Sequence, residues 1–126
     1  MRNIQTIEGL KDILDQYDVF ILDQWGVMHD GKKGYDKAIK CVERLYQEKK
    51  NIIIISNSSK RKETTVNRLP KLGYDPNYFM EVLTSGEMIW QSLDNQNYDF
   101  TRNLKKNCYY MHDYSKKDEK YFIDGL

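Results

Sequence analysis

Two uninterrupted apolar runs, each followed at once by polar residues, constrain the fold of this chain more than any other feature. Residues 19–22 read VFIL and lead into Asp23, and residues 52–55 read IIII and lead into Ser56. Apolar runs without alternation are typical of strands that are buried on both faces, as in a parallel sheet. We therefore expect two neighbouring parallel strands, each ending at a polar side chain.

The segment between the two runs has the pattern of one amphipathic helix. Apolar side chains recur at helical spacing over residues 35–49, which predicts a helix with one buried face. A strand, a helix and a second strand in this order form a βαβ unit, whose crossover is right-handed in nearly all known cases. The predicted fold class is therefore α/β, with a Rossmann-like parallel sheet and flanking helices.

Two further helices are expected before and after this unit. Apolar side chains at helical spacing predict a short helix over residues 6–16, with Thr6 as its cap. A second helix is predicted over residues 61–72. Pro70 should kink or split that helix, because proline has no amide proton.

The second half of the chain has weaker patterns. Residues 80–83 and residues 108–111 are candidate strands, and Ser85 can cap a helix that follows the first of them. Residues 94–106 are polar and are interpreted as a linker.

Composition excludes several classes of protein. Lys and Arg total 20 and Asp and Glu total 19, a balance that argues against a nucleic-acid binder. The longest apolar run is too short to cross a bilayer, and the N-terminus is too polar for a signal peptide. Cys41 and Cys108 have neither metal-ligand nor redox spacing, which fits a reducing compartment. We expect a soluble cytoplasmic protein without nucleic-acid or membrane partners.

Polar residues at neighbouring strand ends suggest phosphoryl chemistry. In open parallel sheets, ligands bind beyond the carboxyl ends of the strands, where Asp23, Ser56 and Asn57 are expected. A carboxylate can attack phosphorus, a hydroxyl and backbone amides can hold phosphoryl oxygens, and Mg²⁺ prefers oxygen ligands. A plainer interpretation stays open, in which these residues are turn and helix-capping residues.

A dinucleotide-binding domain is the competing interpretation of such a unit. It predicts a glycine-rich phosphate loop after the first strand, but Gly26 stands there without the Gly-x-Gly-x-x-Gly pattern. The basic run at residues 60–62 could contact ligand phosphates, although the exposed first turn of a helix is the simpler interpretation.

Three stretches carry a family resemblance. FILDQWGVMHDG at residues 20–31, IIIISNSSKR at residues 52–61 and LTSGEMIW at residues 83–90 resemble motifs of the haloacid dehalogenase superfamily, in particular its class IIA phosphatase branch. The resemblance implies that residues 1–94 form the N-terminal part of the family's core, and that residues 95–126 form a linker and the beginning of a cap domain. It therefore implies an incomplete core.

The resemblance also implies residue roles and an activity. Asp23 would be the nucleophile and a Mg²⁺ ligand, and the backbone carbonyl of Trp25 would be a second Mg²⁺ ligand. Ser56 would hydrogen-bond the transferring phosphoryl group, and Asn57 would shape its pocket. The implied function is Mg²⁺-dependent hydrolysis of a phosphorylated small molecule through an aspartyl-phosphate.

One departure from the family concerns proton transfer. Trp25 stands where the family has the aspartate that protonates the leaving group, and an indole cannot do this. Loss of a general acid typically costs ~100- to 10,000-fold in rate. His29 and Asp30 lie nearby and could substitute, although a loop position near the cavity mouth is the simpler interpretation for His29.

A second departure concerns the family's later motifs, a lysine and an acidic pair. The lysines at positions 105, 106, 116 and 117 lack a strand-end setting and are interpreted as a solvated surface, and Asp124-Gly125 has the wrong order. The first strand would then be an exposed sheet edge, which favours self-association or pairing with a separately encoded C-terminal half. The alternative function is a non-catalytic fragment or subunit of such a split protein.

Overall fold

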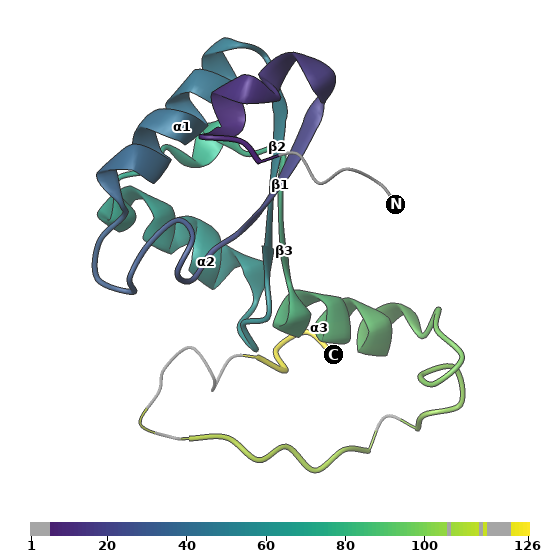
Figure 1. The fold of residues 1–126 in the computed structure, drawn as a ribbon. Helices are drawn as coiled ribbons and strands as arrows, with labels where there is room; N and C mark the ends of the chain where they lie inside the picture. Colours follow the sequence, from purple (N-terminus) through teal and green to yellow (C-terminus); the bar gives the residue numbers. More distant parts are fainter. Residues whose placement is uncertain (1–5, 106, 114, 116–121) are drawn as a thin grey trace.

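The computed structural model describes residues 6–105, 107–113, 115 and 122–126. The sheet comprises β1 (Val19–Asp23), β2 (Asn51–Ser56) and β3 (Glu81–Thr84), in the order β1-β2-β3 (Figure 1). Both pairs of strands are parallel, which confirms the predicted α/β fold class. Because all three strands run in one direction, the polar residues at their carboxyl ends lie along one edge of the sheet.

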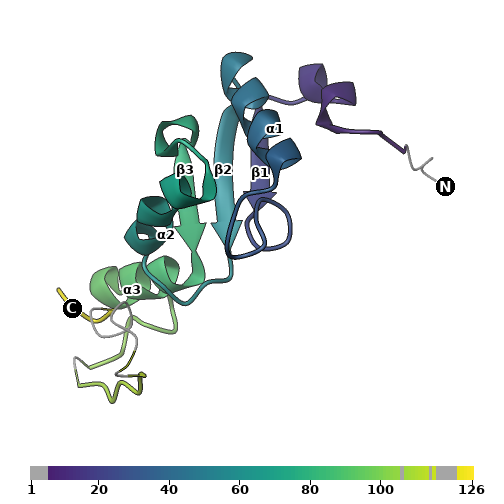
Figure 2. The ribbon, with the colours of Figure 1, turned by 90° about the vertical axis from the view of Figure 1, so that its left-hand side faces the viewer.

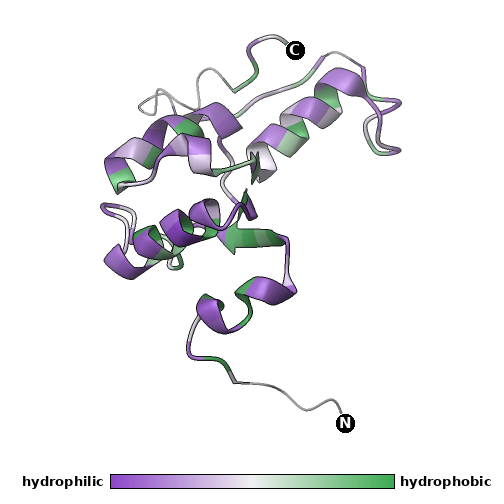
Figure 3. Ribbon diagram, turned by 90° about the horizontal axis from the view of Figure 1, so that it is seen from above, coloured by the Kyte–Doolittle hydropathy of each residue, from purple (hydrophilic) through white to green (hydrophobic). Residues whose placement is uncertain are grey.

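Helices α1 (Asp36–Gln47) and α2 (Lys62–Arg68) lie on the same side of the sheet (Figure 1). Seen from this side, they lie in front of the strands, and α1 contacts β2 while α2 contacts β3 (Figure 2). Helix α3 (Ser85–Asn95) starts at the carboxyl end of β3 and runs away from the sheet. The helices mix hydrophilic and hydrophobic residues, whereas the visible strand is hydrophobic (Figure 3).

The core fills the space between the sheet and the two helices. On the sheet its members are Phe20, Ile52, Ile54 and Val82, and on the helical side they include Val42 and Leu45 of α1. Alternation along the strands explains this set, because every second side chain points to the helix-covered face. The predicted amphipathic character of residues 35–49 is therefore confirmed.

The predicted burial of the first strand on both faces is wrong. Phe20 is buried, but its neighbours Val19 and Ile21 are exposed, and Asp23 is exposed as well. The two crossovers place both helices on one face, and no described element packs along the other. The uninterrupted apolar run therefore does not indicate two covered faces here.

The N-terminal prediction also needs correction. Residues 6–16 do not form one α-helix but contain two 3₁₀ turns, η1 (Leu10–Asp12) and η2 (Leu14–Gln16). The Asp12 carboxylate accepts a hydrogen bond from the Glu8 amide at 2.9 Å, a local bond that competes with helical pairing. No cap by Thr6 is formed, because the helix that it would begin is absent.

The expected interruption at Pro70 is confirmed. Helix α2 ends at Arg68, and the chain continues as the 3₁₀ turn η3 (Leu69–Leu72) with the proline at its start. A further 3₁₀ turn, η4 (Pro76–Tyr78), then leads to β3.

Two expectations after β3 are wrong. The cap of α3 is Thr84, whose hydroxyl accepts the Glu87 amide hydrogen, and the predicted cap Ser85 is the first helical residue. Residues 108–111, all of which the structure describes, have no strand conformation. Among the described helices, none is long and apolar enough to cross a membrane.

Candidate functional site

A cavity of about 260 Å³ lies at the carboxyl edge of the sheet. Its walls come from the loop after β1, the loop after β2 and one face of α2. Ser56, Asn57 and Trp25, which the sequence singled out, all line this cavity. The parallel topology brings them together, because β1 and β2 are neighbours and end at the same edge.

The loop after β2 is held by its own serines. The Ser56 hydroxyl oxygen accepts the Ser58 amide at 3.3 Å, and the Ser58 hydroxyl oxygen accepts the Lys60 amide at 3.3 Å. Hydrogen bonds from backbone amides to serine side chains two residues earlier stabilise a tight turn. The Ser56 oxygen serves as an acceptor within the loop, so its O–H can still donate to an oxygen of a ligand.

Helix α3 clamps the other side of this loop. The Thr84 hydroxyl donates to the Lys60 carbonyl at 2.6 Å, and the Gly86 amide donates to the Ser58 carbonyl at 3.0 Å. A Cβ added at Gly86 would lie 2.1 Å from the Ser59 carbonyl oxygen, so only glycine permits this approach. The first turn of α3 therefore rests directly on the loop backbone.

A partly buried ion pair also joins α3 to the loop after β2. The Arg61 Nε donates to the Glu87 carboxylate at 2.7 Å, and the Arg61 guanidinium lies 3.8 Å from the Trp90 ring centre. Burial alone would raise the pKa of Glu87, but hydrogen bonds from Arg61 and from the Lys62 amide hold that pKa below its ordinary value. The Arg61 guanidinium is therefore engaged by Glu87 and Trp90. The prediction that residues 60–62 form an exposed basic turn is wrong for Arg61.

The loop after β1 forms the opposite wall. The Trp25 side chain is 66% exposed and packs on Gly31, where an added Cβ would lie 2.3 Å from the indole ring. The indole also meets the His29 ring edge-on, with 5.8 Å between ring centres. The Trp25 side chain therefore lies across its own loop.

His29 is a buried side chain in this wall. The side chain is 2% exposed, and Nδ1 accepts the Gly31 amide at 2.9 Å, so the ring proton is placed on Nε2. Burial and the nearby Arg68 guanidinium hold the pKa of His29 below its ordinary value, although Asp30 and Asp23 act in the opposite direction. These features oppose formation of an imidazolium that could act as an acid.

Arg68 links the two walls from the end of α2. It lines the cavity and donates a hydrogen bond to the Gly31 carbonyl. Beneath the loop, the Tyr74 hydroxyl donates to the Met28 carbonyl at 2.6 Å, and burial raises the pKa of Tyr74 to about 12. The loop after β1 is therefore anchored to both α2 and the segment after η3.

Asp23 does not line the cavity. Its partner in the ladder is Ile55, one residue before Ser56, so the two strand ends are adjacent. Alternation places Asp23 on the face of Ile21, whereas Ser56 lies on the helix-covered face with Ile54. The predicted nucleophile and the predicted phosphoryl ligand therefore occupy the same edge but opposite faces.

The oxygen donors predicted for Mg²⁺ are of a suitable kind but few. The Asp23 carboxylate and the Trp25 carbonyl are hard oxygen ligands, which Mg²⁺ prefers. Asp30 is occupied, because its carboxylate accepts the Lys32 and Lys33 amides at 2.8 Å each, and these bonds lower its pKa. No group of three His, Cys, Asp or Glu side chains suited to a metal occurs in the part of the chain that the structure describes. These residues fit Mg²⁺ only if phosphate and water supply its other ligands.

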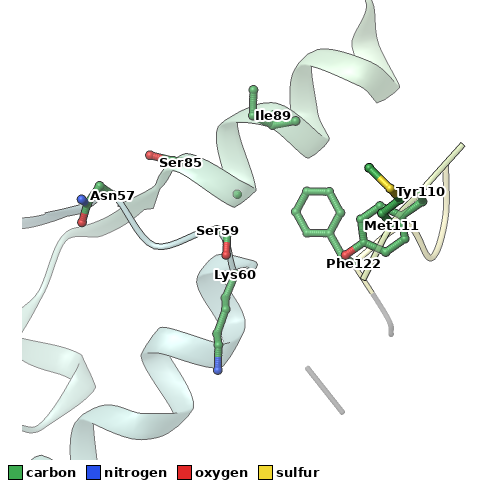
Figure 4. Close-up of a pocket in the computed structure, with 9 residues that line it drawn as sticks. Asn57, Ser59, Lys60, Ser85, Ile89, Tyr110, Met111 and Phe122 are labelled. Carbon is green, nitrogen blue, oxygen red and sulfur yellow. The ribbon is translucent and has the colours of Figure 1, made fainter. Parts of the chain in front are cut away.

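A second cavity of about 400 Å³ adjoins the first (Figure 4). Asn57 and Lys60 line both cavities, so the loop after β2 separates them. Ile89 of α3 forms another part of the wall, and the rings of Tyr110 and Phe122 stack on the opposite side. The larger cavity is therefore more apolar in its lining than the smaller one.

Sequence reasoning missed some of the cavity's polar side chains. Thr64 and Arg68 line it together, and their spacing of four residues on a predicted helix could have shown that they share a face. The buried Glu87 had no comparable signal, because its ion pair with Arg61 depends on how α3 meets the loop.

The comparisons with known proteins agree with this geometry. Residues 20–120 match the family model of haloacid dehalogenase-like hydrolases. A solved hydrolase of the haloacid dehalogenase-like family from Brucella suis 1330 superposes with a TM-score of 0.62 and is 32% identical. The match covers 69% of this chain and 33% of that chain, so this chain spans about one third of the Brucella suis protein. No curated protein was found to match. The fold, the strand-end cavity and the family match together show that the chain belongs to the haloacid dehalogenase-like hydrolase family.

Proposed function

We propose that the smaller cavity binds the phosphoryl group of a phosphorylated small molecule, and that the chain belongs to the class IIA phosphatases. The observation that carries the proposal is the cavity itself. It combines the Ser56 hydroxyl, the Asn57 amide and two cationic side chains, Lys60 and Arg68, at the carboxyl edge of a parallel sheet. Hydroxyl, amide and cationic donors at such an edge are suited to a dianionic phosphate. The proposed location is the cytoplasm.

In the proposed reaction, Asp23 is the nucleophile, and its carboxylate must turn from the uncovered face toward the phosphoryl group at the strand end that it shares with Ser56. A carboxylate oxygen of Asp23 forms a bond to phosphorus while the ester P–O bond breaks, and the leaving oxygen departs as an anion that takes a proton from solvent water. Water then hydrolyses the aspartyl-phosphate to release inorganic phosphate. Ser56 and Asn57 hold the phosphoryl oxygens. A Mg²⁺ ion held by the Asp23 carboxylate and the Trp25 carbonyl would offset the charge between the two anions.

This arrangement favours substrates with acidic leaving groups. Trp25 cannot supply a proton, and burial lowers the pKa of His29, whose Nδ1 already accepts the Gly31 amide. A leaving group that departs as a stable anion needs no such help, whereas an alkoxide does. We therefore expect p-nitrophenyl phosphate to be hydrolysed much faster than glycerol phosphate.

The test is hydrolysis of both esters with Mg²⁺ by the chain and two variants. Asp23→Asn should abolish turnover, and Asp94→Asn, an exposed carboxylate on α3, should leave it unchanged. Turnover that survives Asp23→Asn would refute the role of Asp23. Equal rates on the two esters would show that another group supplies the proton.

A second candidate function is a non-catalytic subunit that binds phosphate. Two observations favour it: Trp25 occupies the position of the proton donor, and Asp23 lies outside the cavity. In that case the chain has no turnover, while calorimetric titration with inorganic phosphate still detects binding. Binding should weaken in Ser56→Ala and persist in Asp23→Asn. Robust turnover by the purified chain would exclude this candidate.

A further inference from the structure

The larger cavity, of about 400 Å³, has the size of pockets that bind small organic molecules. Its lining combines aliphatic and aromatic side chains, and it meets the smaller cavity at Asn57 and Lys60. The smaller cavity is lined by polar and cationic groups. A ligand that occupied both cavities would therefore need an anionic part and an apolar part.

Apolar side chains in the lining of the larger cavity are exposed to water. Ile89 on α3 is 46% exposed, and Met111 on the other side is 81% exposed. Figure 4 shows Ile89 on the helix, with Tyr110, Met111 and Phe122 gathered across from it. An apolar group that entered this space would remove apolar surface of both walls from water, which favours binding.

One wall of the larger cavity is aromatic. The Tyr110 and Phe122 rings stack with 5.8 Å between ring centres and an angle of 18° between ring planes. Nearly parallel rings present flat surfaces, and a planar ring packs against such a surface in an offset stack or edge-on. The wall therefore favours a planar aromatic group over an aliphatic chain.

The anionic part of the ligand is indicated by the residues that the two cavities share. The Asn57 amide and the Lys60 cation stand where the two parts of such a ligand would join. A lysine side chain offers its charged end to a phosphoryl group and its alkyl chain to a neighbouring ring. The two cavities together are suited to a phosphoryl group attached to an aromatic ring.

We propose that the larger cavity binds the aromatic ring of the substrate whose phosphoryl group occupies the smaller cavity. The substrate class is then aromatic phosphate monoesters. This inference rests on the proposed function and adds a preference that leaving-group acidity does not explain. Acidity changes the rate of the chemical step, whereas a ring site changes affinity and acts equally on ligands that have no leaving group.

The test is calorimetric titration of the chain, with Mg²⁺ present, with two phosphonates that cannot be hydrolysed as esters. Methylphosphonate carries the anionic group with one methyl group, and 1-naphthylphosphonate carries the same group on a planar ring system. We expect 1-naphthylphosphonate to bind at least about tenfold more tightly, because burial of about 60 Å² of apolar surface corresponds to that factor. The ring without the anionic group, 1-naphthol, should bind more weakly than 1-naphthylphosphonate.

Two matched variants lie side by side on α3. Ile89→Ser removes an apolar side chain from the cavity wall and should weaken 1-naphthylphosphonate about fivefold, with the affinity for methylphosphonate unchanged. Met88→Ser is the control, because Met88 is 50% exposed and is not among the described residues that line the cavity. Neither change alters the charge that attracts a phosphonate. Phe122→Ala, on the opposite wall, should act like Ile89→Ser.

Circular dichroism shows whether each variant is folded, and Phe122→Ala replaces Ile89→Ser in the comparison if the latter is not. The proposal is supported if 1-naphthylphosphonate binds more tightly, and if Ile89→Ser removes this advantage while Met88→Ser keeps it. Equal affinities for the two phosphonates would overturn the ring site and leave the phosphate site intact. Equal weakening by the two serine variants would overturn it as well.

Two further outcomes separate this inference from the proposed function. A chain that binds neither phosphonate would refute the phosphate site, and the proposed substrate class with it. If 1-naphthol binds as tightly as 1-naphthylphosphonate, the larger cavity is an apolar site without connection to the phosphoryl group, and the substrate proposal is wrong. None of these measurements requires turnover.

Discussion

The two faces of the sheet carry similar side chains but have different surroundings. On the helix-covered face, Ile52 and Ile54 are 0% exposed, whereas Ile55 is 50% exposed on the opposite, uncovered face, called here the open face. All three lie in the same run of four isoleucines on the central strand. The difference arises from the connections, because both crossovers place their helices on one side.

The cavity and its clamps belong to the covered side. Ser56 and Thr84 continue the alternation of the covered face, and Thr84 ties α3 to the loop after β2. Asp23 ends the open face. The comparison shows that Ser56 and Asn57 line the cavity on the covered side, while Asp23 lies at the end of the uncovered face, outside the cavity.

The largest effect should come from removing one isoleucine from each face. We expect Ile54→Ala to lower the free energy of unfolding by about 2–5 kcal/mol, because it opens a cavity in the core. Ile55→Ala should lower it by less than about 1 kcal/mol, because half of that side chain is already in water. Urea denaturation measures both values. Equal losses would show that the open face is covered in solution.

A smaller effect should come from the contact that holds the loop of the cavity. Gly86→Ala should lower the free energy of unfolding by about 1–3 kcal/mol, because the new methyl group meets the backbone of residues 59 and 60. The control is Gly9→Ala, where an added Cβ meets nothing within 4 Å. Its effect should stay within about 0.5 kcal/mol. If Gly86→Ala left the free energy of unfolding unchanged, the close contact between α3 and the loop after β2 would not be present in solution.

The smallest effect concerns pH and the loop after β1. The pKa of His29 is lowered in the folded chain from an ordinary value of 6.5, chiefly by burial. As the pH falls through that ordinary value, the unfolded chain binds a proton first, so stability declines until the pH reaches the folded pKa. Between about pH 7.5 and about pH 5.5, the melting temperature should fall more in the parent chain than in His29→Asn.

Thermal melts at the two pH values measure this difference. Glu87→Gln is the control, because a carboxyl group whose pKa is lowered from 4.5 contributes its pH dependence below this window. An unchanged pH dependence in His29→Asn would show that His29 is accessible to protons in the folded chain.

Much of the fold followed from local patterns. The apolar runs at residues 19–22 and 52–55 are strands, and Pro70 ends α2, because these signals depend on neighbours in the chain. The predicted helix at residues 6–16 failed, because Gly9 is extended and Asp12 bonds a nearby amide instead. The predicted strand at residues 108–111 failed because a strand needs a partner that local sequence cannot supply.

The candidate site was predicted in part for the same reason. Trp25, Ser56 and Asn57 could be placed at one edge of the sheet, because parallel strands end together. Arg68 and Glu87 were missed, since their positions depend on where α2 and α3 pack. The roles assigned to Asp23, Ser56, Asn57 and the Trp25 carbonyl stay predictions, as do the Mg²⁺ ion and the boundary at residues 94 and 95.

The sequence by itself determined the parallel strands, the amphipathic helix between them and the family. Apolar periodicity and polar residues at strand ends are properties of short segments, so they can be recognised in the sequence alone. Only the tertiary structure decided which isoleucines are buried, on which side of the sheet Asp23 lies relative to the cavity, and which basic residue forms the ion pair with Glu87. Those outcomes depend on which face of the sheet each crossover helix covers. A run of apolar residues predicts a strand, but it does not show whether anything packs against the second face of that strand.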